Sequence, residues 1–433
     1  MTIRQNTGIE YVSSVFSEAE NYSKKSMIEN DSSLARIFNL SVDCFEEVFE
    51  WLSLTDLKTL RQTCKRFKTI VDYCLKTNYP ALRIGHGIVE IFDWTKLQHI
   101  DCNCIKEIHF SNRCEYLEDF TEIKGILSQV ENVTVRKDQI CDEFYSTFLK
   151  FCKNLKYLSI SNIHDHTIIG NDNGWLLQRY PILEHIILIE DYLEFRQPTI
   201  ELKTFFELNP NVQTFTTTIQ FLRRNGDCLK EINAKLDQLN VFCNKPFGQL
   251  VNSLLNDLNQ RHFYKRLHLY GSYSTIVTDD LTSVCSLEKL NYARIDRLTL
   301  PPLHDLKEFS IGKVEKNANL ISLAKSLTNV QRIYIEEATL KDIAAFICHT
   351  PNVKHIKVNR LNGGFIFNIR IIELAEVNEG RKKLTGASKI IVYVSDEFFL
   401  FMKWSGLRYS FSLIEFRRVS SHEWKNFCWN HLG

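Results

Sequence analysis

Cysteine and histidine pairs are the residues of this chain whose types and spacing come closest to a metal site. A single residue separates Cys102 from Cys104, with Cys114 nearby. His164 and His166 form a second pair with the same spacing. Residues two apart in a strand share a face, so each pair could offer two ligands to one ion. A structural zinc ion needs four ligands, usually from paired Cys-x-x-Cys elements. The spacing therefore favours small buried thiols and loop histidines, and we expect no metal and no cofactor.

The sequence also offers no nucleophilic or nucleotide-binding motif. A catalytic cysteine needs a lowered pKa and a partner base, and none of the thirteen cysteines is distinguished by its neighbours. A Gly-x-x-x-x-Gly-Lys-Ser/Thr loop, a Gly-x-Ser-x-Gly turn and a His-Glu-x-x-His element are all absent. We therefore predict that the chain is not an enzyme. A cysteine- or metal-dependent enzyme stays open as an alternative class.

Composition is that of an ordinary globular protein. Of 433 residues, 44% are hydrophobic and 24% charged, which suits one large domain or a few smaller ones. The 53 basic residues nearly balance the 52 acidic ones, so bulk charge predicts no binding to nucleic acid or membranes. Short basic runs such as Arg381-Lys382-Lys383 are typical of solvated surface. Scattered cysteines and a start without a signal-peptide pattern predict reduced thiols, in the cytoplasm or the nucleus.

Two amphipathic patterns at helical spacing fill the segment between residues 40 and 71. The first contains Phe45, Val48, Phe49 and Leu52, and the second contains Leu57, Leu60, Cys64 and Phe67. A tight joint at residues 53–56 separates them. About forty residues bury too little apolar surface to be stable alone. The apolar stripes must therefore pack on the rest of the chain or on a partner.

The same segment resembles an F-box. The family pattern opens with Leu-Pro-x-Glu, continues with Ile-Phe-x-x-Leu and Asp-Leu, and ends with Cys-x-x-Trp. The matching elements are Leu40-Ser41-x-Asp43, Val48-Phe49-x-x-Leu52, Asp56-Leu57, and Cys64 with Phe67. The chain departs from the pattern at Ser41, Asp43 and Phe67. Serine can cap a helix where proline would pre-set its entry, so the first departure is mild.

The resemblance implies a substrate receptor of a cullin-based ubiquitin ligase. An F-box docks its apolar stripe on a Skp-type adaptor, which connects it to a cullin. The residues expected to contact the adaptor are Leu40, Ser41, Val48, Leu52 and Leu57. The three phenylalanines of the segment are expected to hold its helices together or to contact the repeats that follow. The rest of the chain would bind a protein substrate.

An internal repeat occupies the chain after residue 80. The unit apolar-x-x-apolar-x-apolar begins at Ile105, Val130, Leu155, Leu183, Val212, Leu236, Tyr264, Leu287, Leu306, Val330 and Val353. Successive units start 19 to 29 residues apart, a period typical of leucine-rich repeats. A degenerate first unit is expected at residues 82–84. The cysteine-containing unit at residues 152–160 resembles the repeat type that often follows an F-box.

Helix-like stretches separate the strand units, and Pro210 and Pro351 end two of these helices cleanly. We therefore expect an α/β fold with a flexible tail at 1–33 and a small helical F-box at 34–80. A curved leucine-rich-repeat solenoid is expected at 81–362, with parallel strands on its concave side and helices outside. Residues 363–433 are expected to hold terminal repeats and a C-terminal cap. An aromatic-lined peptide pocket is the alternative for that region.

Outward strand positions are the candidates for substrate binding, since concave solenoid faces usually bind partners. In the last two clear units these positions include Arg332, Tyr334, His355 and Lys357. Their basic character suits an acidic or phosphorylated peptide, although charge alone favours an ordinary solvated strand face. A leucine-rich-repeat scaffold with no link to ubiquitin is the alternative function.

Overall fold

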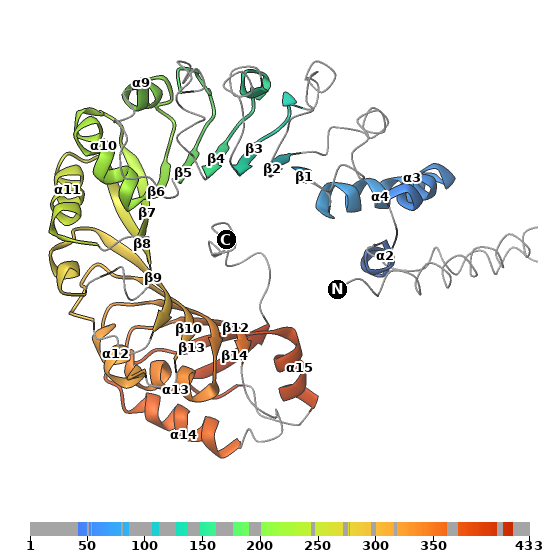
Figure 1. Cartoon of the computed structure of the whole chain (residues 1–433). Coiled ribbons are helices and arrows are strands. Elements are labelled where there is room, and N and C mark those ends of the chain that lie inside the picture. Colours follow the sequence, from blue (N-terminus) through green and yellow to red (C-terminus); the bar gives the residue numbers. More distant parts are fainter. Residues whose placement is uncertain are drawn as a thin grey trace, which may run out of the picture. The chain divides into compact units, whose positions relative to one another are not determined.

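The computed structural model describes sixteen stretches of the chain (Figure 1). They are residues 42–49, 52, 54–78, 81–85, 106–111, 127–136, 148–161, 176–189, 201–243, 247–271, 276, 278–295, 300–315, 318–361, 371–404 and 410–418. The chain divides into two compact units. One comprises residues 1–82 and 94–106, and the other comprises residues 83–93 and 107–433.

The described residues of the first unit form the helices α2 (Val42–Phe49), α3 (Leu54–Thr63) and α4 (Lys65–Asn78). Their shared core consists of Phe45, Phe49, Leu57, Ile70 and Val71, with Leu52, Leu60 and Phe67 packed against it. The second apolar pattern was expected as one helix, and the structure divides it at Cys64. The reason is local: the sulfur of Cys64 accepts a hydrogen bond from the backbone N–H of Phe67 and so caps α4.

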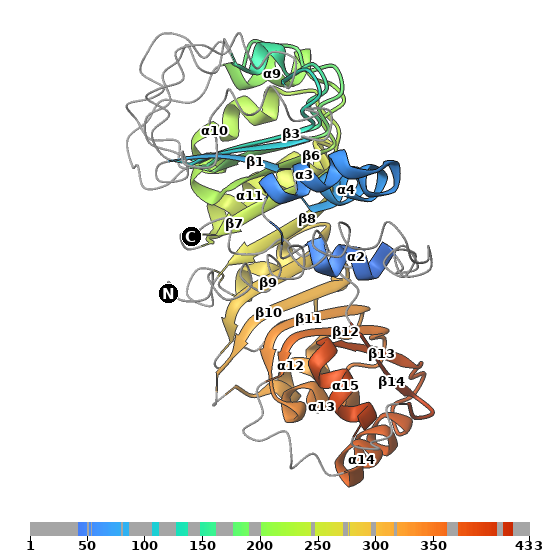
Figure 2. The same ribbon diagram turned by 90° about the vertical axis from the view of Figure 1, so that its right-hand side faces the viewer.

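A sheet of fourteen strands follows, ordered as in the chain. The strands are β1 (Ala81–Gly85), β2 (Glu107–Ser111), β3 (Asn132–Arg136), β4 (Tyr157–Ser161), β5 (His185–Ile189), β6 (Thr214–Thr218), β7 (Leu236–Cys243), β8 (Tyr264–Gly271), β9 (Leu287–Ile295), β10 (Glu308–Val314), β11 (Arg332–Ala338), β12 (His355–Leu361), β13 (Ile390–Val394) and β14 (Ile414–Arg418). Neighbours from β2 to β14 pair in parallel, and Figure 2 shows β7 to β14 as successive rungs. Every predicted repeat unit thus contains a strand.

One face of this sheet is a continuous apolar core. The second apolar residues of the repeat units are all fully buried: Ile108, Val133, Leu158, Ile186, Phe215, Leu239, Leu267, Leu290, Phe309, Ile333 and Ile356. Equivalent residues of neighbouring strands lie side by side, except at one irregularity in the β8–β9 pair. Because a single unit cannot bury its own apolar face, the stacking of neighbours supplies the core.

Helices connect the later strands. They are α9 (Glu201–Leu208), α10 (Ile219–Glu231), α11 (Gln249–Gln260), α12 (Leu320–Ser326), α13 (Leu340–His349), α14 (Ile371–Lys382) and α15 (Asp396–Trp404), with 3-10 turns at Leu149–Phe151 and Thr278–Ser283. Figure 1 shows α9 to α14 along one side of the strands. The fold is therefore α/β, with an open parallel sheet and helices, as predicted. The other face of the sheet carries the candidate binding residues.

A ladder of asparagines joins consecutive turns. Asn154, Asn211, Asn329 and Asn352 each donate a side-chain hydrogen bond to a backbone carbonyl of the preceding turn, at 2.7–2.9 Å. Each of these residues directly precedes the first apolar residue of its unit. The recurring asparagine therefore lies just before the strand of its unit.

The last described part of the sheet is stabilised by a buried arginine. Arg381 of α14 has no exposed surface, although its basic run was expected to be solvated. Its guanidinium donates five hydrogen bonds, to the carbonyl oxygens of Ser388, Ile347, Thr350, Pro351 and Val353. All five N–H groups of the side chain are thereby used. Burial lowers the pKa of Arg381 to about 10, so the guanidinium still carries its charge at neutral pH.

Candidate functional site

Helix α2 presents an exposed apolar side chain on a rigid support. Val48 is 49% exposed, while Phe45 and Phe49 on either side of it are buried. Their spacing on a helix explains this, because positions 45 and 49 share the face that meets α3 and α4. Among the predicted adaptor residues that the structure describes, Val48 is therefore the most exposed apolar side chain.

The other predicted adaptor residues differ in position. Leu57 is fully buried in the core of the three helices, so it stabilises them and presents no surface of its own. Leu52 is partly buried, packs on the same core, and donates its backbone N–H to the carbonyl of Phe49 at 3.2 Å. Leu40 and Ser41 lie outside the described residues.

An aromatic cluster holds α2 against α4. The ring centroids of Phe45 and Phe67 lie 5.5 Å apart in an edge-to-face arrangement, and the guanidinium of Arg66 lies 5.8 Å from the centre of the Phe45 ring. Phe49 lies 5.8 Å from Phe45. Such edge-to-face pairs add stability beyond their buried area. The three phenylalanines hold the helices together, which is the first of the two roles expected from the sequence.

The outward face of the last strands brings together the four residues predicted to bind substrate. Arg332 is directly opposite His355, and Tyr334 is opposite Lys357, in the β11–β12 pair. Parallel pairing extends both rows over β13 and β14. We call the resulting set the basic strand patch: Arg332, Tyr334, His355, Lys357, Ile391, Tyr393, Glu415 and Arg417.

Aromatic contacts order this patch. The ammonium group of Lys357 lies 5.9 Å from the centre of the Tyr334 ring, a favourable cation–π geometry. The rings of His355 and Tyr393 stack at 6.0 Å with an interplanar angle of 24°. The hydroxyl of Tyr334 donates to Glu336. The side chains of this patch therefore support one another across β11, β12 and β13.

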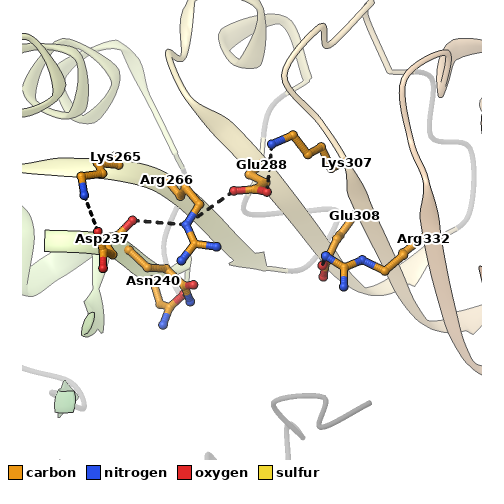
Figure 3. Close-up of polar contacts among 9 residues, drawn as sticks. Asp237, Asn240, Lys265, Arg266, Glu288, Lys307, Glu308 and Arg332 are labelled. Atoms are coloured by element: carbon orange, nitrogen blue, oxygen red, sulfur yellow. Dashed lines mark hydrogen bonds and ion pairs between the residues drawn. The ribbon is translucent and has the colours of Figure 1, made fainter. Parts of the chain in front are cut away.

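Carboxylates shared between two cations recur along the strands. Glu288 lies between Arg266 and Lys307, at 3.7 and 3.2 Å (Figure 3). Glu308, also shown there, pairs with Lys289 at 3.6 Å and with Arg332. One carboxylate cannot neutralise two cations, so each such group leaves a positive charge.

The third shared carboxylate lies at the end of the basic strand patch. Glu415 pairs with Lys389 at 2.6 Å and with Arg417 at 2.7 Å. Hydrogen bonds from these two cations, Arg417 first, lower the pKa of Glu415 to about 2. Glu415 is therefore ionised throughout the physiological range. Of its two cations, Arg417 belongs to the patch and Lys389 pairs with the same carboxylate.

A different surface covers the middle of the sheet. The outward residues of β4 to β6 form what we call the uncharged strand patch: Tyr157, Ser159, Ser161, His185, Ile187, Ile189, Thr214, Thr216 and Thr218. It contains no lysine, arginine, aspartate or glutamate. Ile187 and Ile189 join Phe242 and Tyr270 in a buried apolar cluster, in which the last two rings stack at 4.8 Å.

Cysteine and metal chemistry have little support in the described part of the chain. Burial raises the pKa of the Cys152 thiol to about 12 and also raises the pKa of Cys243, which disfavours the reactive thiolate. No cluster of three or more potential metal ligands occurs among the described residues. Cys102, Cys104 and Cys114, with the His164–His166 pair, lie outside them.

Comparison with known proteins gives one match, to a protein domain. The F-box domain model matches residues 37–79, which include α2, α3 and α4 in full. The resemblance seen in the sequence is thereby confirmed for this segment. No curated protein is significantly similar to the chain. Among the described residues, no helix has the length and apolar character needed to cross a lipid bilayer.

Proposed function

We propose that the chain is the substrate-recognition subunit of a Skp–cullin–F-box ubiquitin ligase. The F-box match at residues 37–79 carries this proposal. The described geometry supports it, because α2 holds Val48 exposed above a core of phenylalanines. An apolar side chain presented by a rigid helix is the kind of anchor that a partner groove receives.

The repeats would supply the substrate-binding surface. Eleven repeat units with buried apolar rows and a period in the twenties support a curved leucine-rich-repeat solenoid, with its strands on the concave side. In this arrangement β13, β14 and α15 act as the C-terminal cap of the stack. The chain performs no bond chemistry itself. It raises the effective concentration of the substrate near the activated ubiquitin.

Co-expression with a Skp-type adaptor, followed by size-exclusion chromatography, tests the proposal. The wild-type chain should co-elute with the adaptor in stoichiometric amounts. Val48→Asp should abolish co-elution, because burying an unpaired carboxylate in an apolar interface costs several kcal/mol. The matched control is Ile321→Asp on α12, since Ile321 is also 49% exposed but lies in the repeats. Circular dichroism should show both variants folded.

One other outcome would reject this function, and a second would reject only the expected contact face. A soluble monomer that ignores the adaptor would leave a leucine-rich-repeat scaffold with no link to ubiquitin as the better description. Full co-elution of Val48→Asp would show that the adaptor contacts another face of α2. We further propose that the complex acts in the cytoplasm or the nucleus, where free thiols such as those of Cys152 and Cys243 stay reduced.

A further inference from the structure

The basic strand patch and the ion pairs at its margins hold an excess of positive charge. The basic side chains are Lys289, Arg332, Lys357, Lys389 and Arg417, and the carboxylates are Glu308, Glu336 and Glu415. Five cations thus face three carboxylates, an excess of two positive charges. The whole chain is nearly neutral, so this excess is a property of the region.

The three carboxylates are already engaged by neighbouring side chains. Glu308 and Glu415 each contact two cations. Glu336 accepts hydrogen bonds from Tyr334 and from the amide of Asn359. A carboxylate whose charge is shared in this way repels an incoming anion less than an isolated one. The side chain of Arg332 remains 49% exposed despite its ion pair, so its guanidinium can reach a ligand.

Apolar and aromatic surface lies between these charges. Tyr334, His355, Ile391 and Tyr393 occupy the same face as Arg332 and Lys357. A patch that binds only free phosphate would need no such surface, and a nucleic-acid groove would need a larger excess of basic residues. Alternating cations and aromatic rings suit a peptide, whose backbone and side chains use both.

We propose that the basic strand patch binds an anionic segment of a protein substrate. This inference rests on the receptor function proposed above and names the chemistry of its substrate. Parallel strands lie about 4.8 Å apart, so the three intervals from Arg332 on β11 to Arg417 on β14 span about 14 Å. An extended peptide covers that distance in about four residues. Clustered glutamates or phosphorylated serines would supply the negative charges.

Fluorescence anisotropy with the purified full-length chain tests the proposal. The probes are a fluorescein-labelled glutamate-rich peptide, a phosphoserine peptide of the same length, and a lysine-rich peptide. Arg332→Glu with Lys357→Glu should raise the Kd for the anionic peptides about tenfold or more. The control pair, Lys341→Glu with Lys403→Glu, makes the same change in net charge on exposed positions of α13 and α15. It should alter the Kd by less than about twofold.

Several results would overturn the proposal. They are failure of the wild type to bind either anionic peptide, equal binding of the lysine-rich peptide, an equal loss in the control pair, and tighter binding of a single-stranded DNA oligonucleotide. Tighter binding of the phosphoserine peptide would support the proposal with phosphate as the source of charge. Equal binding of both anionic peptides would support it with carboxylates.

Adaptor co-elution, measured on the same variants, separates this inference from the receptor function. Both double variants should still co-elute with the adaptor, because neither changes α2, α3 or α4. Peptide binding without adaptor binding would reject the receptor function and keep the anionic-segment site. Adaptor binding without peptide binding would reject the site alone.

Discussion

The uncharged and basic strand patches lie on one sheet and share one architecture, yet their outward surfaces differ in kind. On the opposite face of the same strands the residues are fully buried, such as Leu158 for the uncharged patch and Ile333 for the basic patch. The uncharged patch has mostly hydroxyl and aliphatic side chains, with Tyr157 and His185 at its β4 and β5 strand starts, and Ile187, Ile189 and Thr216 are buried. The basic patch has long charged and aromatic side chains, such as Arg332. Packing therefore restricts the core-facing positions to apolar residues in both regions. The residue types at the outward positions differ between the two patches.

The boundary between the two regions lies at β8 and β9. Lys289 is buried there, 5.9 Å from the centre of the Tyr270 ring and 3.6 Å from Glu308. Burial lowers the pKa of Lys289, and Glu308 opposes that shift. The Lys289 side chain thus lies near Tyr270 of the apolar cluster and also pairs with Glu308, which is shared with Arg332 of the basic strand patch. The change of surface therefore occurs over β7 to β10, the strands that lie between the two patches.

The largest effect is expected behind the charged region, at Arg381. Arg381→Met leaves five backbone carbonyls without their donor, and we expect unfolding free energy to fall by about 3–5 kcal/mol. Urea denaturation followed by tryptophan fluorescence measures this loss. Lys382→Met, on the exposed neighbour that pairs with Glu379, should change stability by less than about 0.5 kcal/mol. Equal effects of the two substitutions would show that the buried hydrogen bonds of Arg381 contribute little.

A somewhat smaller effect is expected in the apolar cluster next to the uncharged patch. Phe242→Ala should lower stability by about 3 kcal/mol, because Phe242 is buried and stacked on Tyr270. Under conditions in which the Phe242→Ala variant is folded, its affinity for an anionic peptide should equal that of the wild type. Leu250→Ala, on an exposed position of α11, is the control. A large loss of peptide affinity in folded Phe242→Ala would show that the two regions act as one surface.

The smallest effect concerns acid sensitivity at the boundary. The pKa of His268 is lowered to about 3, first by burial and then by the nearby charges of Lys289, Arg266 and Arg332. The folded chain therefore holds His268 neutral where the unfolded chain protonates it. That difference costs stability as the pH falls from about 6.5 towards about 3 and has no effect above about 7.

His268→Gln should remove this sensitivity. Between pH 7 and pH 5 the wild type should lose about 1–2 kcal/mol more stability than the variant, by urea denaturation at each pH. His262→Gln, on the turn between α11 and β8, is the control. An identical pH dependence of wild type and His268→Gln would contradict the lowered pKa.

Local patterns predicted much of the fold, for a definable reason. The units beginning at Val330 and Val353 became β11 and β12. The spacing of apolar residues indicates which side chains are buried in the fold. For a strand of this repeat, about six consecutive residues are enough to recognise the pattern. The helical stripes of residues 45–67 were visible for the same reason. Their division at Cys64 was not, because it depends on one capping contact.

Site geometry was less predictable. Val48 and Leu57 occupy equivalent places in an apolar stripe, and only packing of the three helices leaves the first exposed and buries the second. Arg381 lies in a basic run for which the sequence predicts a solvated surface. Its burial depends on five carbonyl acceptors, four at residues 347–353 and one at residue 388. A sequence window holds no information on which distant groups will meet.

The sequence by itself indicated the repeat and the position of its strands, because both depend on short-range spacing of apolar residues. The F-box character of residues 40–71 came from their resemblance to the family pattern, since helical periodicity alone also fits an ordinary helical hairpin. Tertiary structure alone decided which charges come together. Glu308 meets Lys289 and Arg332 from two neighbouring strands, and Glu415 meets Lys389 from the turn before β13. These partners are far apart in the chain, and register between strands brings them within hydrogen-bonding or ion-pair distance. The basic strand patch is thus a product of stacking, since no single repeat contains it.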